Sequence, residues 1–165
     1  MEEKKSRVWI LVGPPASGKS TWAASKKDSP LFSDDVHIVS RDQVRYSLVK
    51  ESEPYFSKET LVFNTFANEI IKSIENHKDT IVDATNVNLK SRRKLFNRIL
   101  PFIDQTTVEF NAVFFVTPLE FCLQRNSTRK GRTRVPDSAL RNIFNSYQEP
   151  TYAEGFANIY SVKCG

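Results

Sequence analysis

The stretch Gly13-Pro14-Pro15-Ala16-Ser17-Gly18-Lys19-Ser20-Thr21 decides the fold, because it matches Gly-x-x-x-x-Gly-Lys-Ser/Thr at every fixed position. An apolar run at residues 8–12 predicts a buried strand directly before it, and a helix is expected directly after it. The two glycines let the backbone wrap closely around phosphate oxygens, with a helix N-terminus behind them. All nine residues are therefore candidate contacts to ATP. Lys19 is expected to reach the β- and γ-phosphates, and the Ser20 hydroxyl is expected to bind Mg²⁺.

Strand and helix signals alternate outward from this loop. Apolar runs predict further strands at 36–39, 80–82, 108–116 and 158–162. Helical spacing and boundary residues predict helices at 57–77, at 89–100, from 118 onward and at 138–148. This alternation indicates an α/β protein with a five-stranded, mainly parallel sheet flanked by helices. We expect one P-loop kinase domain over residues 1–165, with an arginine-rich lid.

Composition describes an ordinary globular protein of 165 residues, with 39% hydrophobic and 26% charged residues. A formal charge of +5 and a pI near 9.2 favour anionic partners such as nucleotides or nucleic acid. Cys122 and Cys164 have neither zinc spacing nor a disulfide framework. The chain shows no signal peptide and no apolar run long enough for a membrane span, so we expect a cytoplasmic protein without a membrane partner. The sequence leaves the oligomeric state open.

Asp83 ends a predicted strand, where an open α/β sheet places its ligand-binding groups. We expect it to support Mg²⁺ or to contact the acceptor, together with Thr85 and Asn86. The alternative is that Asp-Ala-Thr-Asn forms only a turn or a helix cap.

Asp42 and Arg45 follow another short strand and lie on one face of the next predicted helix. A carboxylate here could accept the proton of a hydroxyl aimed at the γ-phosphate, and an arginine one turn away could bind a phosphate. The alternative is an N-capping aspartate with an exposed ion pair. Asp34 and Asp35 are rival acids, although they precede the strand.

Arg125 and Arg129 lie one helical turn apart, where a helix loosens at Gly131. This arrangement is typical of a mobile lid that places guanidinium groups on transferring phosphates, and Arg132 and Arg134 extend it. A solvated basic helix end is the alternative. A second basic cluster comprises Arg92, Arg93, Lys94 and Arg98. For this cluster a solvated helix face is favoured over a nucleic-acid role.

Several enzyme classes that share the phosphate loop are disfavoured. The Asn-Lys-x-Asp sequence with which GTPases read guanine is absent. Motor and chaperone ATPases usually need a larger domain with further elements. A small chain with many arginines beyond the loop favours a phosphotransferase.

The motifs GPPASGKST, SRDQVR, DATN and RNSTRKGRTRVP, in this order and spacing, resemble the kinase domain of bacteriophage-type polynucleotide 5′-hydroxyl kinases. The resemblance covers about residues 8–148. It implies an ATP- and Mg²⁺-dependent enzyme of nucleic acid repair that phosphorylates the 5′ ends of DNA or RNA.

The resemblance also implies roles for individual residues. Asp42 matches the general base for the 5′-hydroxyl, and Arg45 matches the arginine that holds the acceptor's 3′-phosphate. Arg125 and Arg129 match the lid arginines that contact the phosphates of ATP in these kinases. The resemblance also implies a catalytic role for Arg129. Val135 falls where these enzymes approach the acceptor nucleoside.

The chain departs from the phage pattern at several positions. Gln43 stands where an acid often follows the aspartate, Asp-Ala-Thr-Asn has one extra residue, and one residue is inserted between Arg129 and Val135. No phosphatase domain follows, so a 3′-phosphatase activity is not expected from this chain. Two other functions stay open: a kinase for a small hydroxyl compound such as a sugar, nucleoside or antibiotic, and a nucleotide-binding module without transfer activity.

Overall fold

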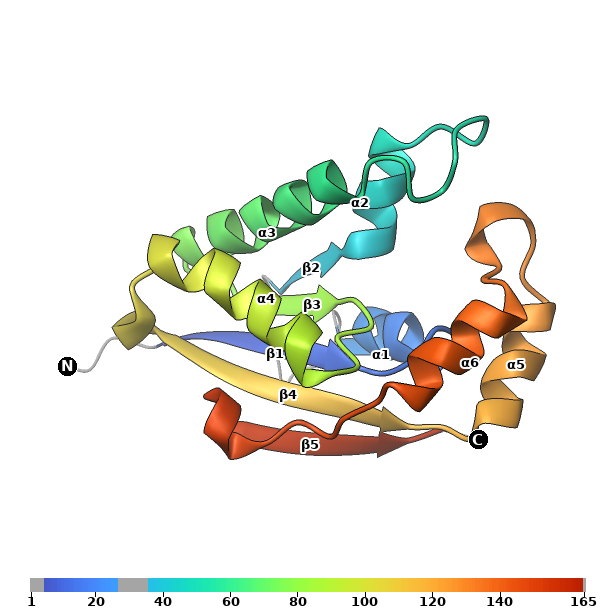
Figure 1. The fold of residues 1–165 in the computed structure, drawn as a ribbon. Coiled ribbons are helices and arrows are strands. Elements are labelled where there is room, and N and C mark those ends of the chain that lie inside the picture. Colours follow the sequence, from blue (N-terminus) through green and yellow to red (C-terminus); the bar gives the residue numbers. More distant parts are fainter. Residues whose placement is uncertain (1–4, 27–35, 165) are drawn as a thin grey trace.

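Among the residues that the computed structural model describes, 5–26 and 36–164, five strands form one central sheet (Figure 1). The strands are β1 (Ser6–Val12), β2 (His37–Ser40), β3 (Thr80–Asp83), β4 (Val108–Val116) and β5 (Asn158–Lys163). Their order is β2-β3-β1-β4-β5, and every neighbouring pair is parallel. The predicted five-stranded parallel sheet is thereby confirmed.

Helices cover both faces of this sheet. Helices α3 (Glu59–Glu75) and α4 (Leu89–Ile99) pack on one face, and α1 (Lys19–Lys26) packs on the other (Figure 1). Successive side chains of a strand point to opposite faces, so β1 contributes to both layers. Val8 and Ile10 are fully buried under α3 and α4, whereas Leu11 is buried on the side of α1.

The remaining elements are short. They are α2 (Arg41–Leu48), α5 (Leu119–Ser127), α6 (Asp137–Asn145) and the 3-10 helices η1 (Leu100–Phe102), η2 (Gln105–Thr107), η3 (Gly131–Thr133) and η4 (Tyr152–Glu154). A capping box between Asn88 and Ser91 starts α4, and Pro118 and Pro136 directly precede α5 and α6. The predicted helix at 138–148 ends earlier, at Asn145, and is followed by a turn at Ser146.

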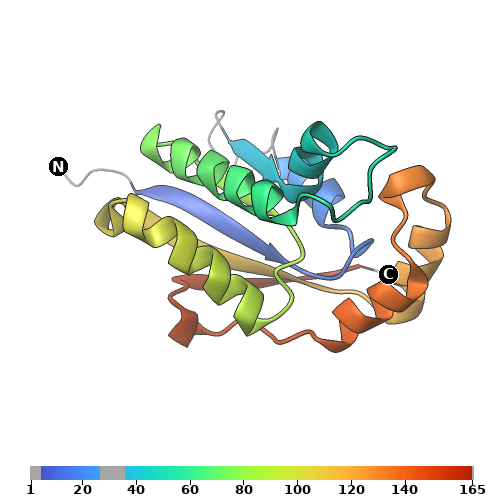
Figure 2. The same cartoon turned by 45° about the horizontal axis from the view of Figure 1, so that its top comes forward.

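The carboxyl ends of all five strands lie at the same edge of the sheet, because the strands are parallel. The phosphate loop after β1, Asp83 on β3 and the start of α2 therefore come together there. Figure 2 shows α2 and the α5–η3–α6 segment at this end of the molecule. The rival acids Asp34 and Asp35 lie outside the described residues. Within the described ranges, no helix is both long and apolar enough to cross a membrane.

Candidate active site

A cleft of about 500 Å³ opens at the carboxyl edge of the sheet. It is walled by the phosphate loop, the end of β3, α2 with its following loop, and the segment 119–145, here called the lid, which comprises α5, η3 and α6. The predicted site residues that line it are Pro15, Ala16, Gly18, Lys19, Ser20, Thr21, Asp42, Arg45, Asp83, Thr85, Arg125, Arg129 and Val135. The predicted residues that do not line it are Gly13, Pro14, Ser17 and Asn86.

The phosphate loop has the tight backbone that its glycines allow. Ala16 and Gly18 have positive φ angles of 64° and 106°, and only glycine adopts the second without strain. Gly13 is required for space: a Cβ there would lie 2.7 Å from Ser17 Oγ and 3.2 Å from Phe115 Cβ. Steric constraints therefore explain why the motif requires glycine at both fixed positions.

Lys19 begins α1 and is buried, with 8% of its surface exposed. Its Nζ donates to the carbonyl of Pro14 at 2.8 Å, so the ammonium folds back over its own loop. Burial lowers the Lys19 pKa to about 8, while the charges of Asp83 and Asp42 oppose the shift. Lys19 and both candidate acids thus share one electrostatic environment.

The pKa of Lys19 predicts how nucleotide binding depends on pH. Only the protonated amine attracts phosphate, and ligand-free Lys19 loses its proton as the pH rises through about 8. We expect the affinity for ADP, measured by calorimetry, to fall about tenfold between pH 7 and pH 9. Lys19→Met should bind weakly at both pH values. A wild-type affinity that does not change over this range would contradict the assignment.

Ser20 and Asp83 form the candidate magnesium site. Ser20 Oγ donates to Asp83 Oδ2 at 2.8 Å, which joins the end of the phosphate loop to the end of β3. Asp83 is 7% exposed, and burial raises its pKa, an effect that the Ser20 hydrogen bond and Lys19 oppose. A hydroxyl and a carboxylate oxygen are ligands that Mg²⁺ accepts, so the two residues fit the ion that the motif implies.

Asp42 and Arg45 lie on one face of α2, as their spacing predicts. The helix is capped by Ser40, whose Oγ accepts from the Gln43 backbone, so Asp42 is free of the capping role. Arg45 Nη1 donates to Asp42 Oδ1 at 2.9 Å, and the side chain of Asp42 remains 61% exposed in the cleft. Arg45 therefore orients a carboxylate that faces the cleft.

Arg45 itself is buried and firmly held. Its Nε and Nη2 bind both oxygens of Glu59 at 2.9 and 3.1 Å, and Nη1 also donates to the hydroxyl of Tyr55. A guanidinium has five N–H groups, and four are used by Glu59, Asp42 and Tyr55. One N–H of Arg45 is left for a ligand.

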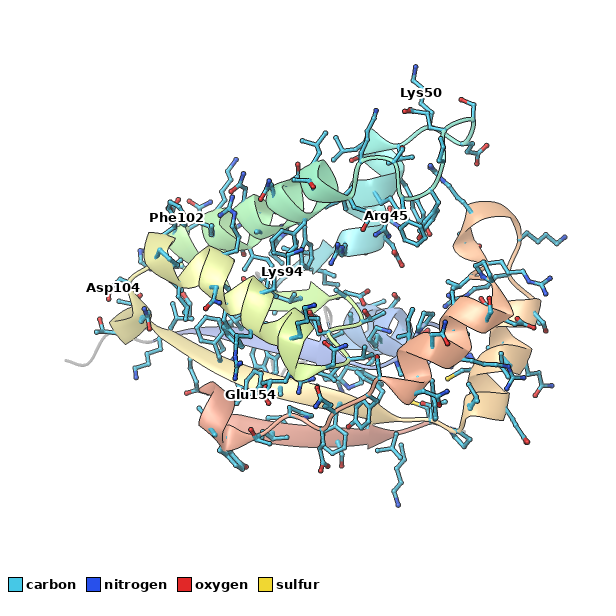
Figure 3. All side chains as sticks on the ribbon, in the orientation of Figure 1. Arg45, Lys50, Lys94, Phe102, Asp104 and Glu154 are labelled. Carbon is cyan, nitrogen blue, oxygen red and sulfur yellow. The ribbon has the colours of Figure 1, made fainter. Side chains whose placement is uncertain are left out.

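Asn86 lies below the cleft, and its side chain supports the backbone. Its Nδ2 donates to the carbonyl of Leu11 at 3.1 Å, and its own backbone has a positive φ of 44°. Arg92 is buried, donates to the Asn86 carbonyl at 2.8 Å and pairs with Glu154, whose place on η4 is labelled in Figure 3. Asn86 and Arg92 thus hold the turn that presents Thr85 to the cleft.

The basic cluster on α4 is divided by the fold. Arg92 is used internally, and Arg98 donates to Asn64 and Asn68 of α3. These two arginines have structural roles, so the expected solvated helix face is wrong for Arg92, which is buried by its pairing with Glu154. Arg93 and Lys94 are exposed.

Arg125 and Arg129 line the cleft from the lid, opposite α2. Asn126 lies between these two arginines in the sequence, and its side chain is fully buried. Its Nδ2 donates to the carbonyl of Val135, and its Oδ1 accepts from the backbone N–H of Val135 at 3.0 Å. This pairing closes the lid turn at its base. These hydrogen bonds hold Val135 where it lines the cleft.

Arg132 connects the lid to α2 across the cleft. Its Nη1 and Nη2 donate to the carbonyls of Val49 at 2.6 Å and Tyr46 at 3.3 Å, and its guanidinium lies 4.4 Å from the centre of the Tyr46 ring. Carbonyls at a helix C-terminus lack helical partners and attract cations. The lid that carries Arg125 and Arg129 is therefore anchored on the helix that carries Asp42.

Loss of this anchor should weaken nucleotide binding. We expect Arg132→Ala to raise the KM for ATP on the order of tenfold, because two charge-assisted hydrogen bonds that hold the lid against α2 are removed. Lys130→Ala removes an exposed lid cation that does not line the cleft, and should leave the KM unchanged. Steady-state kinetics of both variants checks this prediction. If Arg132→Ala and Lys130→Ala have equal KM values for ATP, Arg132 does not anchor the lid.

Several residues in or beside the cleft carry no sequence signal. Glu59 reads as a helix start, and Phe56 lies in an irregular loop with 65% of its surface exposed. Tyr46 lines the cleft near Asp42, and burial, followed by the Asp42 charge, raises its pKa to about 12. The Tyr46 hydroxyl is thus a hydrogen-bond donor at neutral pH.

The chain is similar to several known proteins. A bifunctional polynucleotide phosphatase/kinase of Schizosaccharomyces pombe is 22% identical over 170 residues, a match that covers 99% of this chain and 35% of that protein. A chain of the Pnkp1/Rnl/Hen1 RNA repair complex is 26% identical with a TM-score of 0.68, over 88% of this chain and 45% of that one. This chain therefore spans less than half the length of either protein.

A sugar kinase from Janibacter sp. HTCC2649 has a TM-score of 0.64 over 96% of this chain and 85% of its own, but at 15% identity it shows a shared fold alone. A family model described as an AAA domain matches residues 8–150. Since this match spans most of the chain, the protein belongs to that AAA domain family and has the P-loop kinase fold.

Proposed function

We propose that this protein transfers the γ-phosphoryl group of ATP to the 5′-hydroxyl of a polynucleotide. The observation that carries the proposal is the position of Asp42: an exposed carboxylate oriented by Arg45, in a cleft whose other walls are the phosphate loop and the lid arginines. Phosphoryl transfer depends mainly on positioning and on neutralising charge, and this cleft supplies groups for both.

The donor side comprises the phosphate loop and the lid. Lys19 leaves the Pro14 carbonyl to meet the β- and γ-phosphates, and Arg125 and Arg129 approach the transferring group from the lid. Ser20 and Asp83 would hold Mg²⁺, which when bound neutralises charge on the β- and γ-phosphate oxygens. Thr21 lines the same end of the cleft.

The acceptor side comprises α2, the loop after it and the lid turn. Asp42 accepts the proton of the 5′-hydroxyl, and Arg45 offers its remaining N–H to the acceptor's 3′-phosphate. Val135 and the exposed ring of Phe56 line the same cleft and supply apolar surface on which a nucleobase can pack. Thr85 completes this side.

Relatives support a nucleic-acid acceptor over a small one. The curated relative is a polynucleotide phosphatase/kinase, and the 26% identical chain belongs to an RNA repair complex, whereas the sugar kinase shares only the fold. The proposal covers the 5′ ends of both DNA and RNA.

The test is ADP production with a panel of acceptors. A 5′-hydroxyl oligonucleotide should stimulate ADP release, and nucleosides, sugars and aminoglycosides should not. Because the oligonucleotide is held through its phosphates, its kcat/KM should decrease with rising salt. Stimulation by a small compound alone would support a small-molecule kinase instead, and ATP binding with no stimulated turnover would support a non-catalytic module.

A further inference from the structure

A second, smaller cavity of about 160 Å³ adjoins the active-site cleft. Arg41, Ala84 and Thr85 line both spaces, so the two spaces are neighbours. The cavity lies between α3 and α4 and is also lined by Phe63 and Lys94. In Figure 3 Lys94 is seen on α4 and Arg45 on α2, both on the side of the sheet that α3 covers. The cavity therefore lies beside the part of the cleft that Asp42 lines, because Arg41, the residue before Asp42, lines both spaces.

Two cations share one aromatic ring at this cavity. Lys94 Nζ lies 4.5 Å and the Arg41 guanidinium 5.6 Å from the centre of the Phe63 ring. Within residues 5–26 and 36–164, no carboxylate pairs with Lys94, and the buried Nε of Arg41 has no hydrogen-bond partner. The cavity is therefore lined by two cationic side chains, which favour an anion.

The spacing of Arg41 and Arg45 also suits two neighbouring phosphates of one ligand. They lie one turn apart on α2, and Glu59 holds both: its Oε2 accepts from Arg41 Nη2 at 3.2 Å and its Oε1 from Arg45 Nε at 2.9 Å. One carboxylate thus fixes two guanidiniums: Arg45 lines the cleft, and Arg41 lines both the cleft and the cavity. Such a row of cations matches the row of phosphates in a nucleic acid strand.

We propose that Arg41 and Lys94 form a subsite for the second backbone phosphate of the acceptor, beyond the one that Arg45 contacts. This inference rests on the proposed function and adds a preference for longer acceptors. The enzyme prefers a dinucleotide with two 3′-linked phosphates over a nucleoside 3′-phosphate. A small-molecule kinase has no use for such a subsite.

The test compares two acceptors, a 5′-hydroxyl nucleoside 3′-phosphate and a 5′-hydroxyl dinucleotide with a 3′-phosphate. In the wild-type protein kcat/KM should favour the dinucleotide about tenfold, the effect of a charge-assisted contact. Lys94→Ala should move this ratio towards one, and Arg41→Lys should lower it in part, because an ammonium has no planar fork. The salt slope for the dinucleotide should become shallower by about 0.7 in Lys94→Ala, which is one phosphate contact to a single strand.

The matched control is Arg93→Ala, which removes an exposed cation from the next position of the same helix and does not line the cavity. It should keep the wild-type ratio and salt slope, which separates a subsite from a general charge effect. Equal ratios in Lys94→Ala and Arg93→Ala would overturn the inference. Failure of the wild-type protein to phosphorylate either acceptor would instead overturn the proposed function.

Discussion

Asp42→Asn should lower kcat by roughly 10²–10⁴-fold, the usual contribution of a general base. Asparagine keeps the shape of the side chain and can still accept from Arg45 through its Oδ1. It cannot take the proton of the attacking hydroxyl. The loss should therefore be in kcat, with little change in the KM for ATP, because the donor side of the cleft is untouched.

Gln43→Ala is the matched control for this variant. Gln43 is exposed on the same turn of α2, does not line the cleft, and uses only its backbone N–H for the Ser40 cap. It should keep wild-type kcat. Single-turnover measurements with saturating ATP isolate the transfer step in both variants. If Asp42→Asn keeps near-wild-type kcat, then Asp42 is not the base.

Lys19→Met should lower kcat/KM by roughly 10²–10³-fold, the effect of removing one preorganised charge from a transition state. Methionine fills much of the volume of the lysine stem but has no cation. Lys19 lies near Asp83 and Asp42 in a buried site, where an ammonium acts strongly on phosphate. Both nucleotide affinity and transfer should suffer, unlike the kcat effect expected for Asp42→Asn.

Lys26→Met provides the comparison for this variant. Lys26 ends the same helix, and its Nζ lies 5.4 Å from the centre of the Trp22 ring, outside the cleft. It should keep wild-type kinetics. Thermal unfolding of both variants establishes that the fold persists, and equal activity of the two variants would show that Lys19 does not serve the donor.

The sequence predicts the local features of this site well, because they depend on short spacings. The motif at 13–21 fixes the phosphate loop through steric demands on two glycines and the position of one lysine. The i,i+3 spacing of Asp42 and Arg45 predicts their contact, since both lie on one helical turn. Alternating strands and helices predict a parallel sheet, but the place of β3 between β2 and β1 comes only from the structure.

Contacts between distant segments could not be predicted. Glu59 binds Arg45 from another helix, and Arg132 reaches carbonyls more than 80 residues away, at Tyr46 and Val49. Arg92 belongs to a basic run in the sequence, yet it is buried because Glu154 lies beside it in the fold. Each of these pairings depends on how the elements pack, and a single sequence shows only which residues are charged.

The most direct test of a polynucleotide 5′-kinase follows labelled γ-phosphate from ATP onto an oligonucleotide with a free 5′-hydroxyl. The same oligonucleotide with a 5′-phosphate serves as its control. We predict label on the first oligonucleotide only, released as the 5′-terminal nucleotide after nuclease digestion, and almost none with Asp42→Asn. Equal labelling of both oligonucleotides, or labelling of neither while a small hydroxyl compound is phosphorylated, would contradict the proposed function.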